Sequence, residues 1–387
     1  MDIKELDNEY VAHAYGRFDV CLTHGKGSTL YDNKGKKYID FGSGIGVTAF
    51  GICDEIWKGA VIEQLSKVQH TSNLYYTYPC AELAKLLCEK SGMKKVFFGN
   101  SGAEANEGAI KFARKYSFDK YGEGRSTIIT LTDSFHGRTI TTLAATGQDE
   151  FHTTFGPFTD GFKYCPANDC ETLKKMATND VCAIMFECIQ GEGGVNNLTQ
   201  EFVDTIAQIA KEKDILTVVD EVQTGNGRTG KYFAYENYSI KPDIVSTAKG
   251  LAGGLPTGAV LFGEKVADCV TPSSHGSTFG GNPIAAAGAI SIVKRIDDEF
   301  LEQIREKSKY ITDFIKNIKG VKAITGMGLM LGIETDKLAS DIAKQCLENG
   351  LLVLTAHKNR VRLLPALNIS YDEIDEGLKI LKEVIEK

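Results

Sequence analysis

The sequence predicts an α/β protein: a doubly wound, mostly parallel sheet with a smaller α+β unit beside it. Between residues 92 and 265, short runs rich in β-branched residues alternate with helical stretches, the pattern of parallel strands with helices on both faces. From about residue 300 the chain alternates helix and strand again. The first fifty residues have the pattern of a β-meander, and we expect them to pack with this C-terminal part.

The strands of the large sheet are expected where the apolar, β-branched runs lie. These runs are residues 94–98, 126–132, 181–187, 215–219, 243–246 and 257–263. Helices are expected at 103–120 and at 199–213, with Thr199 as the N-cap of the second. Each helix follows a strand, as a parallel sheet requires.

The remaining elements belong to the smaller unit. An alanine-rich helical segment after Asn282-Pro283 leads out of the sheet, and further strands are expected at 329–334, 351–355 and 360–364. We divide the chain into an N-terminal segment of the small domain (1–55), a large domain (56–290) and the C-terminal part of the small domain (291–387).

Composition and charge favour small-molecule chemistry. The 387 residues are 42% hydrophobic, which excludes a disordered or fibrous chain, and 44 Lys and Arg against 51 Asp and Glu give a net charge of −7 that does not attract nucleic acid. The ten cysteines form no CxxC pair, so we expect no metal site and buried, reduced thiols. No run of about 18 apolar residues is present and the start is acidic, so a cytoplasmic protein is expected.

Polar motifs follow five of the predicted strands. Because ligands bind at the carboxyl ends of strands in open α/β sheets, these motifs are expected to share one site. They are Asn100-Ser101-Gly102-Ala103, Ser134-Phe135-His136-Gly137-Arg138, Gln190-Gly191-Glu192-Gly193, Asp220-Glu221-Val222-Gln223 and Ala248-Lys249-Gly250.

Each motif has a functional and a structural interpretation. Ser101-Gly102-Ala103 opens a helix, where free amides can hold a phosphate or simply form a capped turn. Asp220 ends an apolar strand, where it can pair with a protonated ring nitrogen or form an ordinary salt bridge. Lys249 can form a Schiff base, although a solvated role is commoner for a lysine.

Four more side chains complete the set. Phe135 can stack on a flat ring or pack in the core. Arg138 and Arg362 can each bind a carboxylate with two hydrogen bonds or form a structural ion pair, and Glu192 is a candidate partner for one of them. Together, a phosphate site, a stacking ring, a buried acid and a lysine match the requirements of pyridoxal phosphate.

The chain also resembles the class III aminotransferases of fold type I over its whole length. The stretches that carry the resemblance are 99–116, 134–148, 189–196, 218–230, 246–260 and 275–283. The resemblance implies a seven-stranded sheet and a homodimer with its sites at the interface. It implies no nucleic acid or membrane partner.

The resemblance also implies residue roles. Lys249 binds the cofactor aldehyde covalently, and Asp220 keeps the pyridine nitrogen protonated. Gly102 and Ala103 bind the phosphate with Ser101, and Phe135 stacks on the ring. Gln223 reaches the ring hydroxyl, with Glu221 and Val222 beside it. Thr278 completes the phosphate site of the neighbouring subunit.

The implied reaction transfers the terminal amine of N-acetylornithine to 2-oxoglutarate, in arginine biosynthesis. Arg138 is expected to hold the distal carboxylate of the donor, with Ser277 and Tyr15 as further contacts, and Arg362 the α-carboxylate of glutamate. We hypothesise that Glu192 masks Arg362 in the first half-reaction. Ornithine, succinylornithine, succinyl-diaminopimelate and 4-aminobutyrate stay open as alternative donors.

Two sequence motifs suggest other enzyme classes. The Gly225–Gly230 motif fits a dinucleotide-binding pattern, but it neither begins at a strand end nor opens a helix, and the Ser246–Lys249 motif of serine acyl enzymes lacks its partner motifs. A catalytically silent cofactor-binding protein would lack Lys249 or carry a DNA-reading module.

The chain departs from the family at Ile52-Cys53-Asp54-Glu55 and at Cys188, which puts local loop conformation in question.

Overall fold

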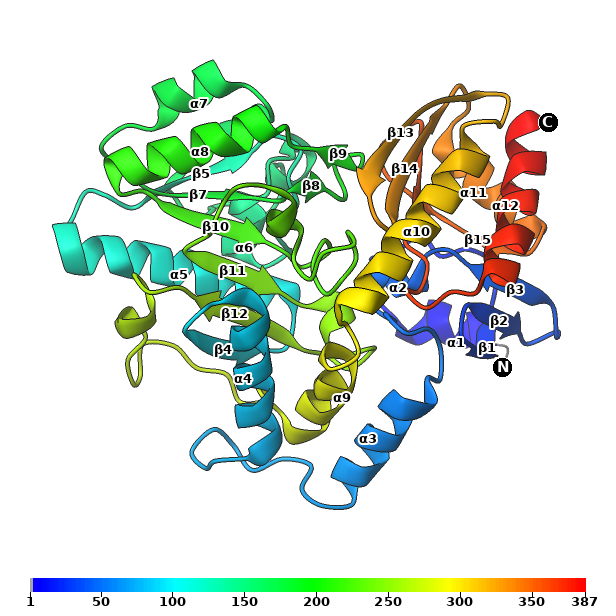
Figure 1. Cartoon of the computed structure of the whole chain (residues 1–387), viewed down its shortest axis with the longest axis horizontal. Helices are drawn as coiled ribbons and strands as arrows, with labels where there is room; N and C mark the ends of the chain where they lie inside the picture. Colours follow the sequence, from blue (N-terminus) through cyan, green and yellow to red (C-terminus); the bar gives the residue numbers. More distant parts are fainter. Residues whose placement is uncertain (1–2) are drawn as a thin grey trace.

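The computed structural model describes residues 3–387. A seven-stranded sheet dominates it, with the strand order β4, β12, β11, β10, β7, β5, β6 (Figure 1). The strands are β4 (Lys95–Gly99), β5 (Thr127–Leu131), β6 (Phe162–Cys165), β7 (Val181–Phe186), β10 (Leu216–Asp220), β11 (Ile244–Thr247) and β12 (Gly258–Phe262). Within this sheet β12 runs antiparallel to its neighbours β11 and β4, and the other pairs are parallel. The predicted mostly parallel sheet is confirmed.

Helices cover both faces of this sheet. α5 (Gly102–Tyr121) lies across β4, β7, β10, β11 and β12 on one face, where its buried side chains pack with those of the strands. α4 (Tyr78–Ser91), α8 (Gln200–Lys213) and α9 (Pro283–Val293) contribute to the core on the other face. The Thr199 side chain accepts a hydrogen bond from Phe202 N, so the predicted N-cap of α8 is confirmed.

Short elements fill the connections of the large unit. Two short strands, β8 and β9, form a ribbon after β7, and α3 packs on α9. These elements are α3 (Glu55–Leu65), α6 (Ile140–Ala145), α7 (Cys170–Met176), β8 (Ile189–Gln190), β9 (Asn196–Asn197), η1 (Asp149–His152), η2 (Ala234–Asn237), η3 (Lys249–Leu251) and η4 (Ala267–Cys269).

The smaller unit combines both ends of the chain, as predicted (Figure 1). One sheet is β1-β2-β3-β15 and the other β13-β14-β17-β16. Its elements are α1 (Ile3–Tyr10), β1 (Leu22–Lys26), β2 (Thr29–Asp32), β3 (Lys37–Asp40), α2 (Ser43–Gly46), α10 (Asp298–Ile315), β13 (Val321–Met327), β14 (Met330–Thr335), α11 (Ala339–Glu348), β15 (Leu351–Leu352), β16 (Leu354–Thr355), β17 (Arg360–Leu363) and α12 (Tyr371–Glu386).

The structure corrects two details. The predicted strand 351–355 is split: its first two residues pair with β3 and its last two with β17, so this segment joins the two sheets. β6 and β13 were not predicted, because both lie at sheet edges and are only partly buried.

The departures from the family pattern are accommodated locally. Ile52 forms a backbone bridge with Gly27, and Asp54 caps α3 through Trp57 N and binds both terminal nitrogens of Arg295, at 2.8 and 3.1 Å. Cys188 is fully buried, and burial raises the pKa of its thiol well above the usual value. The expectation of buried thiols is wrong for Cys53, which is exposed.

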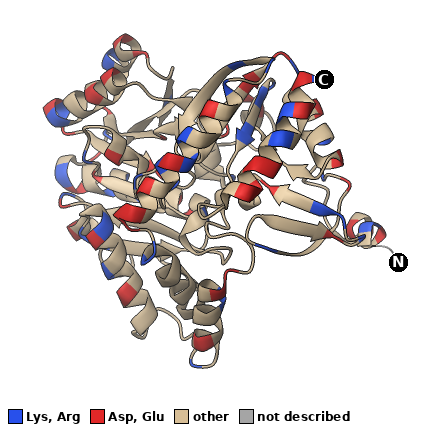
Figure 2. Ribbon diagram, turned by 45° about the vertical axis from the view of Figure 1, so that its right-hand side comes forward, with Lys and Arg blue, Asp and Glu red and all other residues tan. Residues whose placement is uncertain are grey.

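The helices between Ile3 and Lys387 are each too short or too polar to cross a bilayer. On the face drawn in Figure 2, basic and acidic residues are interspersed along the outer helices.

Candidate active site

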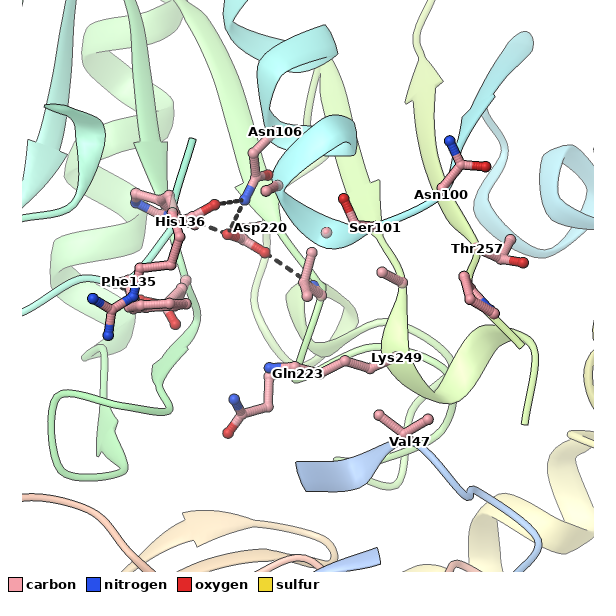
Figure 3. Close-up of a pocket in the computed structure, with 18 of the residues that line it drawn as sticks. Val47, Asn100, Ser101, Asn106, Phe135, His136, Asp220, Gln223, Lys249 and Thr257 are labelled. Atoms are coloured by element: carbon pink, nitrogen blue, oxygen red, sulfur yellow. Dashed lines mark hydrogen bonds and ion pairs between the residues drawn. The ribbon is translucent and has the colours of Figure 1, made fainter. Parts of the chain in front are cut away.

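A cavity of about 400 Å³ opens at the carboxyl ends of the parallel strands. Segments that follow β4, β5, β7, β10 and β11 all contribute to its lining, so the predicted convergence of five strand ends is confirmed. Val47 reaches the cavity from the N-terminal segment (Figure 3). The lining includes Asn100, Ser101, Gly102, Ala103, Asn106, Phe135, His136, Arg138, Glu187, Asp220, Val222, Gln223, Lys249 and Thr257.

One end of the cavity is the N-terminus of α5. Ser101 caps this helix by accepting from Glu104 N at 3.1 Å, and Glu104 in turn accepts from Asn100 N. The next two amides, of Gly102 and Ala103, belong to the first turn and have no carbonyl partner within the helix. With the positive end of the helix dipole they form a site suited to a phosphate.

Two glycines keep this end open. A Cβ on Gly102 would lie 2.6 Å from Val222 Cγ1. Gly137 has a φ of +143°, and a Cβ there would lie 2.5 Å from Thr142 Oγ1 and 2.8 Å from Ala103 Cβ. The loops after β5 and β10 therefore approach α5 more closely than larger residues allow.

Asp220 lies at the base of the cavity with 3% of its surface exposed. Its Oδ2 accepts from Asn106 Nδ2 at 2.7 Å and contacts His136 Nδ1 at 2.8 Å, and its Oδ1 accepts from Val222 N at 2.9 Å (Figure 3). Burial alone would lower the pKa of His136, but the hydrogen bond and the charge of Asp220 outweigh it and raise that pKa. These contacts hold the carboxylate in one orientation.

Glu187 is a second buried acid beside the cavity. It accepts from Phe135 N at 3.1 Å and from Gly191 N at 3.4 Å, so it joins the loops after β5 and β7. Burial raises its pKa to about 7, and the neighbouring His136 partly offsets this shift.

Lys249 follows β11 in the left-handed region, with a φ of +43°, a strained backbone for a residue with a side chain and one that is frequent at active sites. Burial lowers the pKa of its amine, Glu192 acts in the opposite direction, and Arg362 adds to the lowering. The lowered pKa increases the fraction of the amine in its nucleophilic, uncharged form relative to a solvated lysine.

Arg362, on β17, forms the second charged cluster. It donates to Glu192 Oε1 at 2.7 Å, to Gln223 Oε1 at 2.8 Å and to Gly191 O at 2.9 Å. Burial alone would raise the pKa of Glu192, but the charge and hydrogen bond of Arg362, together with Lys249 and Gln223, outweigh burial and lower that pKa. Arg362 Nε is buried and has no partner among residues 3–387.

Six predicted residues lie outside the cavity lining. Glu192 and Arg362 both contact Gln223, which is part of the lining, and the other four lie as follows. Ser277 Oγ contacts Asn100 Nδ2 at 3.2 Å, next to the cavity, whereas Thr278 lines a separate cavity with Tyr75 and Tyr76. Tyr15 is exposed and lines a third, at the N-terminal segment. The Glu221 carboxylate points into the core and accepts from Thr224 Oγ1 and Tyr235 N.

Our interpretation of the sequence assigned no role to Asn106, His136 and Glu187. His136 stood in a quoted motif and Glu187 at a strand end, but their contacts with Asp220 or Phe135 arise only from folding.

The dinucleotide-binding alternative does not fit the structure. The Gly225–Gly230 segment is a series of turns that leads to the short η2 rather than to an α-helix. Its Arg228 is buried and donates to Leu329 O and Pro365 O, so the segment connects the large and small units.

Comparisons with known proteins agree with this site. The family model of the class III aminotransferases matches residues 10–385. Acetylornithine aminotransferase of Haemophilus ducreyi is 51% identical over 99% of this chain and 98% of its own. Among solved structures, N-acetylornithine aminotransferase of Stenotrophomonas maltophilia is 36% identical, with a TM-score of 0.86 over 98% of both chains. Ornithine aminotransferase of Toxoplasma gondii is 29% identical, with a TM-score of 0.94 over 99% of this chain and 93% of its own.

The chain therefore belongs to the class III aminotransferases. It is an aminotransferase of fold type I whose cofactor is pyridoxal phosphate. The residues of the cavity fit this group: free amides and a helix N-terminus suit the phosphate, Asp220 suits a protonated ring nitrogen, and Lys249 suits the aldehyde.

Proposed function

We propose that this protein transfers the terminal amine of N-acetylornithine to 2-oxoglutarate, the transamination of arginine biosynthesis, in the cytoplasm. The observation that carries the proposal is that two separate arginines lie at the cavity: Arg138 lines it, and Arg362 lies next to it and donates to Gln223 of the lining at 2.8 Å. Each can bind a carboxylate with two hydrogen bonds. The names of the relatives at 41–51% identity support the same donor.

The cofactor is held by the first amides of α5, by Asp220 and by Lys249 in this proposal, with Ser101, Phe135, Val222 and Gln223 beside it. Bound pyridoxal phosphate supplies a carbonyl that condenses with amines and a ring that accepts the electron pair left when a carbon loses its proton. Asp220 favours this role because its fixed carboxylate stabilises a positive charge on the ring nitrogen.

Lys249 moves the proton. Its Nζ is uncharged at neutral pH more often than that of a solvated lysine because burial lowers its pKa. With the cofactor bound and the substrate amine in place of the lysine, Nζ would be free to take the proton from the donor carbon and to return it on the cofactor side. The same atom acts first as base and then as acid.

Two substrates of different shape use this one cavity. The terminal amine of N-acetylornithine lies far from its carboxylate, which we assign to Arg138, with Ser277 and Tyr15 as further contacts. The α-amine of glutamate lies beside its carboxylate, which we assign to Arg362. Glu192 neutralises Arg362 in the structure, and it must rotate away before Arg362 can bind glutamate.

The proposal includes a homodimer with sites at the interface. Leu74 and Tyr78 are 88% and 92% exposed, and an apolar surface of this kind favours contact with another protein. Thr278 lies in a cavity beside Tyr75 and Tyr76. We assign its hydroxyl to the phosphate site of the partner subunit.

The unit boundaries are also proposed: residue 55 at the start of α3, and residues 294–297 between α9 and α10 in place of the boundary expected at 290.

A donor panel tests the proposed substrate. N-acetylornithine, ornithine, N-succinylornithine, N-succinyl-diaminopimelate and 4-aminobutyrate are each supplied with 2-oxoglutarate, and glutamate formation is followed. The largest kcat/KM is expected for N-acetylornithine. A larger value for any other donor would reassign the substrate without changing the reaction class.

A further inference from the structure

The Arg138 guanidinium is held by aromatic rings rather than by acids. Its Cζ lies 3.9 Å from the ring centroid of Phe151 and 5.6 Å from that of Phe135. Across residues 3–387 it forms no hydrogen bond or ion pair. All five N–H donors of an exposed arginine are therefore available to a ligand.

The choice of support matters for the chemistry. A carboxylate partner would fix the guanidinium by occupying its N–H donors and cancelling its charge. A ring packed on the face of the guanidinium restrains it by a cation–π contact and leaves the in-plane donors free. Aromatic support thus positions a cation while keeping its binding capacity intact.

Phe151 is itself well anchored. It lies in η1, where its N donates to Gln148 O at 3.1 Å, and Gln148 Nε2 donates to Ser134 O at 3.0 Å. The next residue, His152, contacts Leu143 O through Nε2 at 2.9 Å. The segment is therefore fastened to α6 and to the same loop that carries Phe135 and Arg138.

The two rings form one support. Phe135 and Phe151 meet edge to face, with centroids 6.4 Å apart and an interplanar angle of 76°, a favourable geometry for aromatic pairs. Phe135 lines the cavity (Figure 3), so the support continues from the cofactor side of the site to Arg138.

We propose that Phe151 is a positioning residue that sets the specificity of the first half-reaction. By restraining the Arg138 guanidinium with its donors free, Phe151 favours terminal amines that carry a carboxylate at the opposite end. This inference rests on the proposed function, because it takes Arg138 as the group that binds the distal carboxylate.

The test compares two donors that differ only in that carboxylate. N-acetylornithine and N-acetylputrescine, which has the same chain without the carboxylate, are each mixed with the cofactor-loaded enzyme in the absence of a keto acid. The rate of loss of the visible cofactor band at increasing donor concentration gives an apparent dissociation constant and a limiting rate. Wild type, F151L, F151Y, R138Q and R138Q/F151L are compared.

F151L keeps an apolar side chain but removes the ring face. It should raise the apparent dissociation constant for N-acetylornithine about fivefold to tenfold and leave the limiting rate and the response to N-acetylputrescine unchanged. F151Y should restore the wild-type constant, and F151L should have no further effect in the R138Q background.

Two results would overturn the proposal: an equal loss with both donors, which would indicate packing alone, and an unchanged constant for N-acetylornithine. Two other results would overturn the proposed function, and this inference with it. In the first, the wild-type enzyme does not respond to N-acetylornithine. In the second, the R138Q variant still discriminates between the two donors.

Discussion

In the proposed function, the choice between the two half-reactions depends on Glu192. Its carboxylate contacts Arg362 at 2.7 and 3.2 Å, and Gln223 bridges the pair by donating to Glu192 and accepting from Arg362. Access of an α-carboxylate to Arg362 therefore requires that this three-residue cluster open.

Replacing Glu192 by Gln should shift donor preference toward α-amino acids. Arg362 would lose its neutralising partner, so glutamate would bind without displacing a charge. We expect the ratio of kcat/KM for glutamate to that for N-acetylornithine to rise about tenfold, which corresponds to about 1.4 kcal/mol. The same substitution at the exposed Glu212 of α8 is the control, and an unchanged ratio in E192Q would exclude the gating role.

The buried Glu221 makes stability depend on pH. Burial raises its pKa to about 7, above the ordinary value near 4.5, so the folded protein binds a proton there more tightly than the unfolded chain. Its stabilising contribution is present below pH 4.5 and is lost as the pH rises through 7.

Between pH 4.5 and 8, wild type should therefore lose free energy of unfolding relative to E221Q, by on the order of 3 kcal/mol. Denaturant unfolding of both proteins at matched protein concentration measures the difference in free energy of unfolding between them. The other titrating groups are the same in both proteins, so their contributions cancel in this difference. Parallel pH profiles would show that Glu221 titrates normally.

At the scale of elements, the N-terminus of α5 is built for close approach. Gly102→Ala would place a Cβ 2.6 Å from Val222 Cγ1, and the displaced loop would disturb both the helix amides and Asp220. We expect the dissociation constant of pyridoxal phosphate to rise at least tenfold. Fluorescence titration of the cofactor-free protein measures it.

The companion variant G102A/V222A separates steric from other effects. It removes the side chain that the new Cβ would meet, so cofactor affinity should return most of the way to the wild-type value. A double variant as weak as G102A alone would show that the clash with Val222 is not the cause.

Elements were predictable from sequence where local pattern decides them. The central strands are continuous apolar runs, since both faces are buried, and Thr199 marks the start of α8 chemically. Edge strands β6 and β13 are half-exposed and carry no such run. The split of 351–355 between two sheets depends on which strands lie nearby, which no local pattern encodes.

The candidate site shows the same division. Residues at strand ends, such as Asp220 and Lys249, could be found because topology alone brings them together. Asn106 lies one turn inside a helix and His136 lies in a loop. Both contact Asp220, although they lie 114 and 84 residues before it in the sequence. The role proposed for Phe151 likewise depends only on its distance to Arg138.

At the scale of the whole molecule, the two units meet at the site. Arg362 belongs to the small unit and Lys249 to the large one, and Arg228 joins them by donating to Leu329 O and Pro365 O. The proposed dimer extends this principle, because Thr278 would complete a site in the partner subunit.

Complementation tests that arrangement. K249A and T278A should each be poorly active alone, the first without its amine and the second without a phosphate ligand. Mixed dimers should recover activity, because the T278A chain keeps Lys249 and receives Thr278 from its partner. Unfolding and refolding the two variants together, compared with each alone, gives the readout. No recovery, with mixed dimers shown by mass, would place Thr278 outside the partner's site.

The most direct measurement of the central claim is an absorbance spectrum of the purified protein before and after addition of N-acetylornithine, with no keto acid present. We expect a visible band from the cofactor on Lys249 that converts to a near-ultraviolet band when the donor is added. A visible band that does not respond to N-acetylornithine would contradict the proposed donor. The absence of a protein-bound visible band, after pyridoxal phosphate has been added and the unbound excess removed, would contradict the assignment of the site itself.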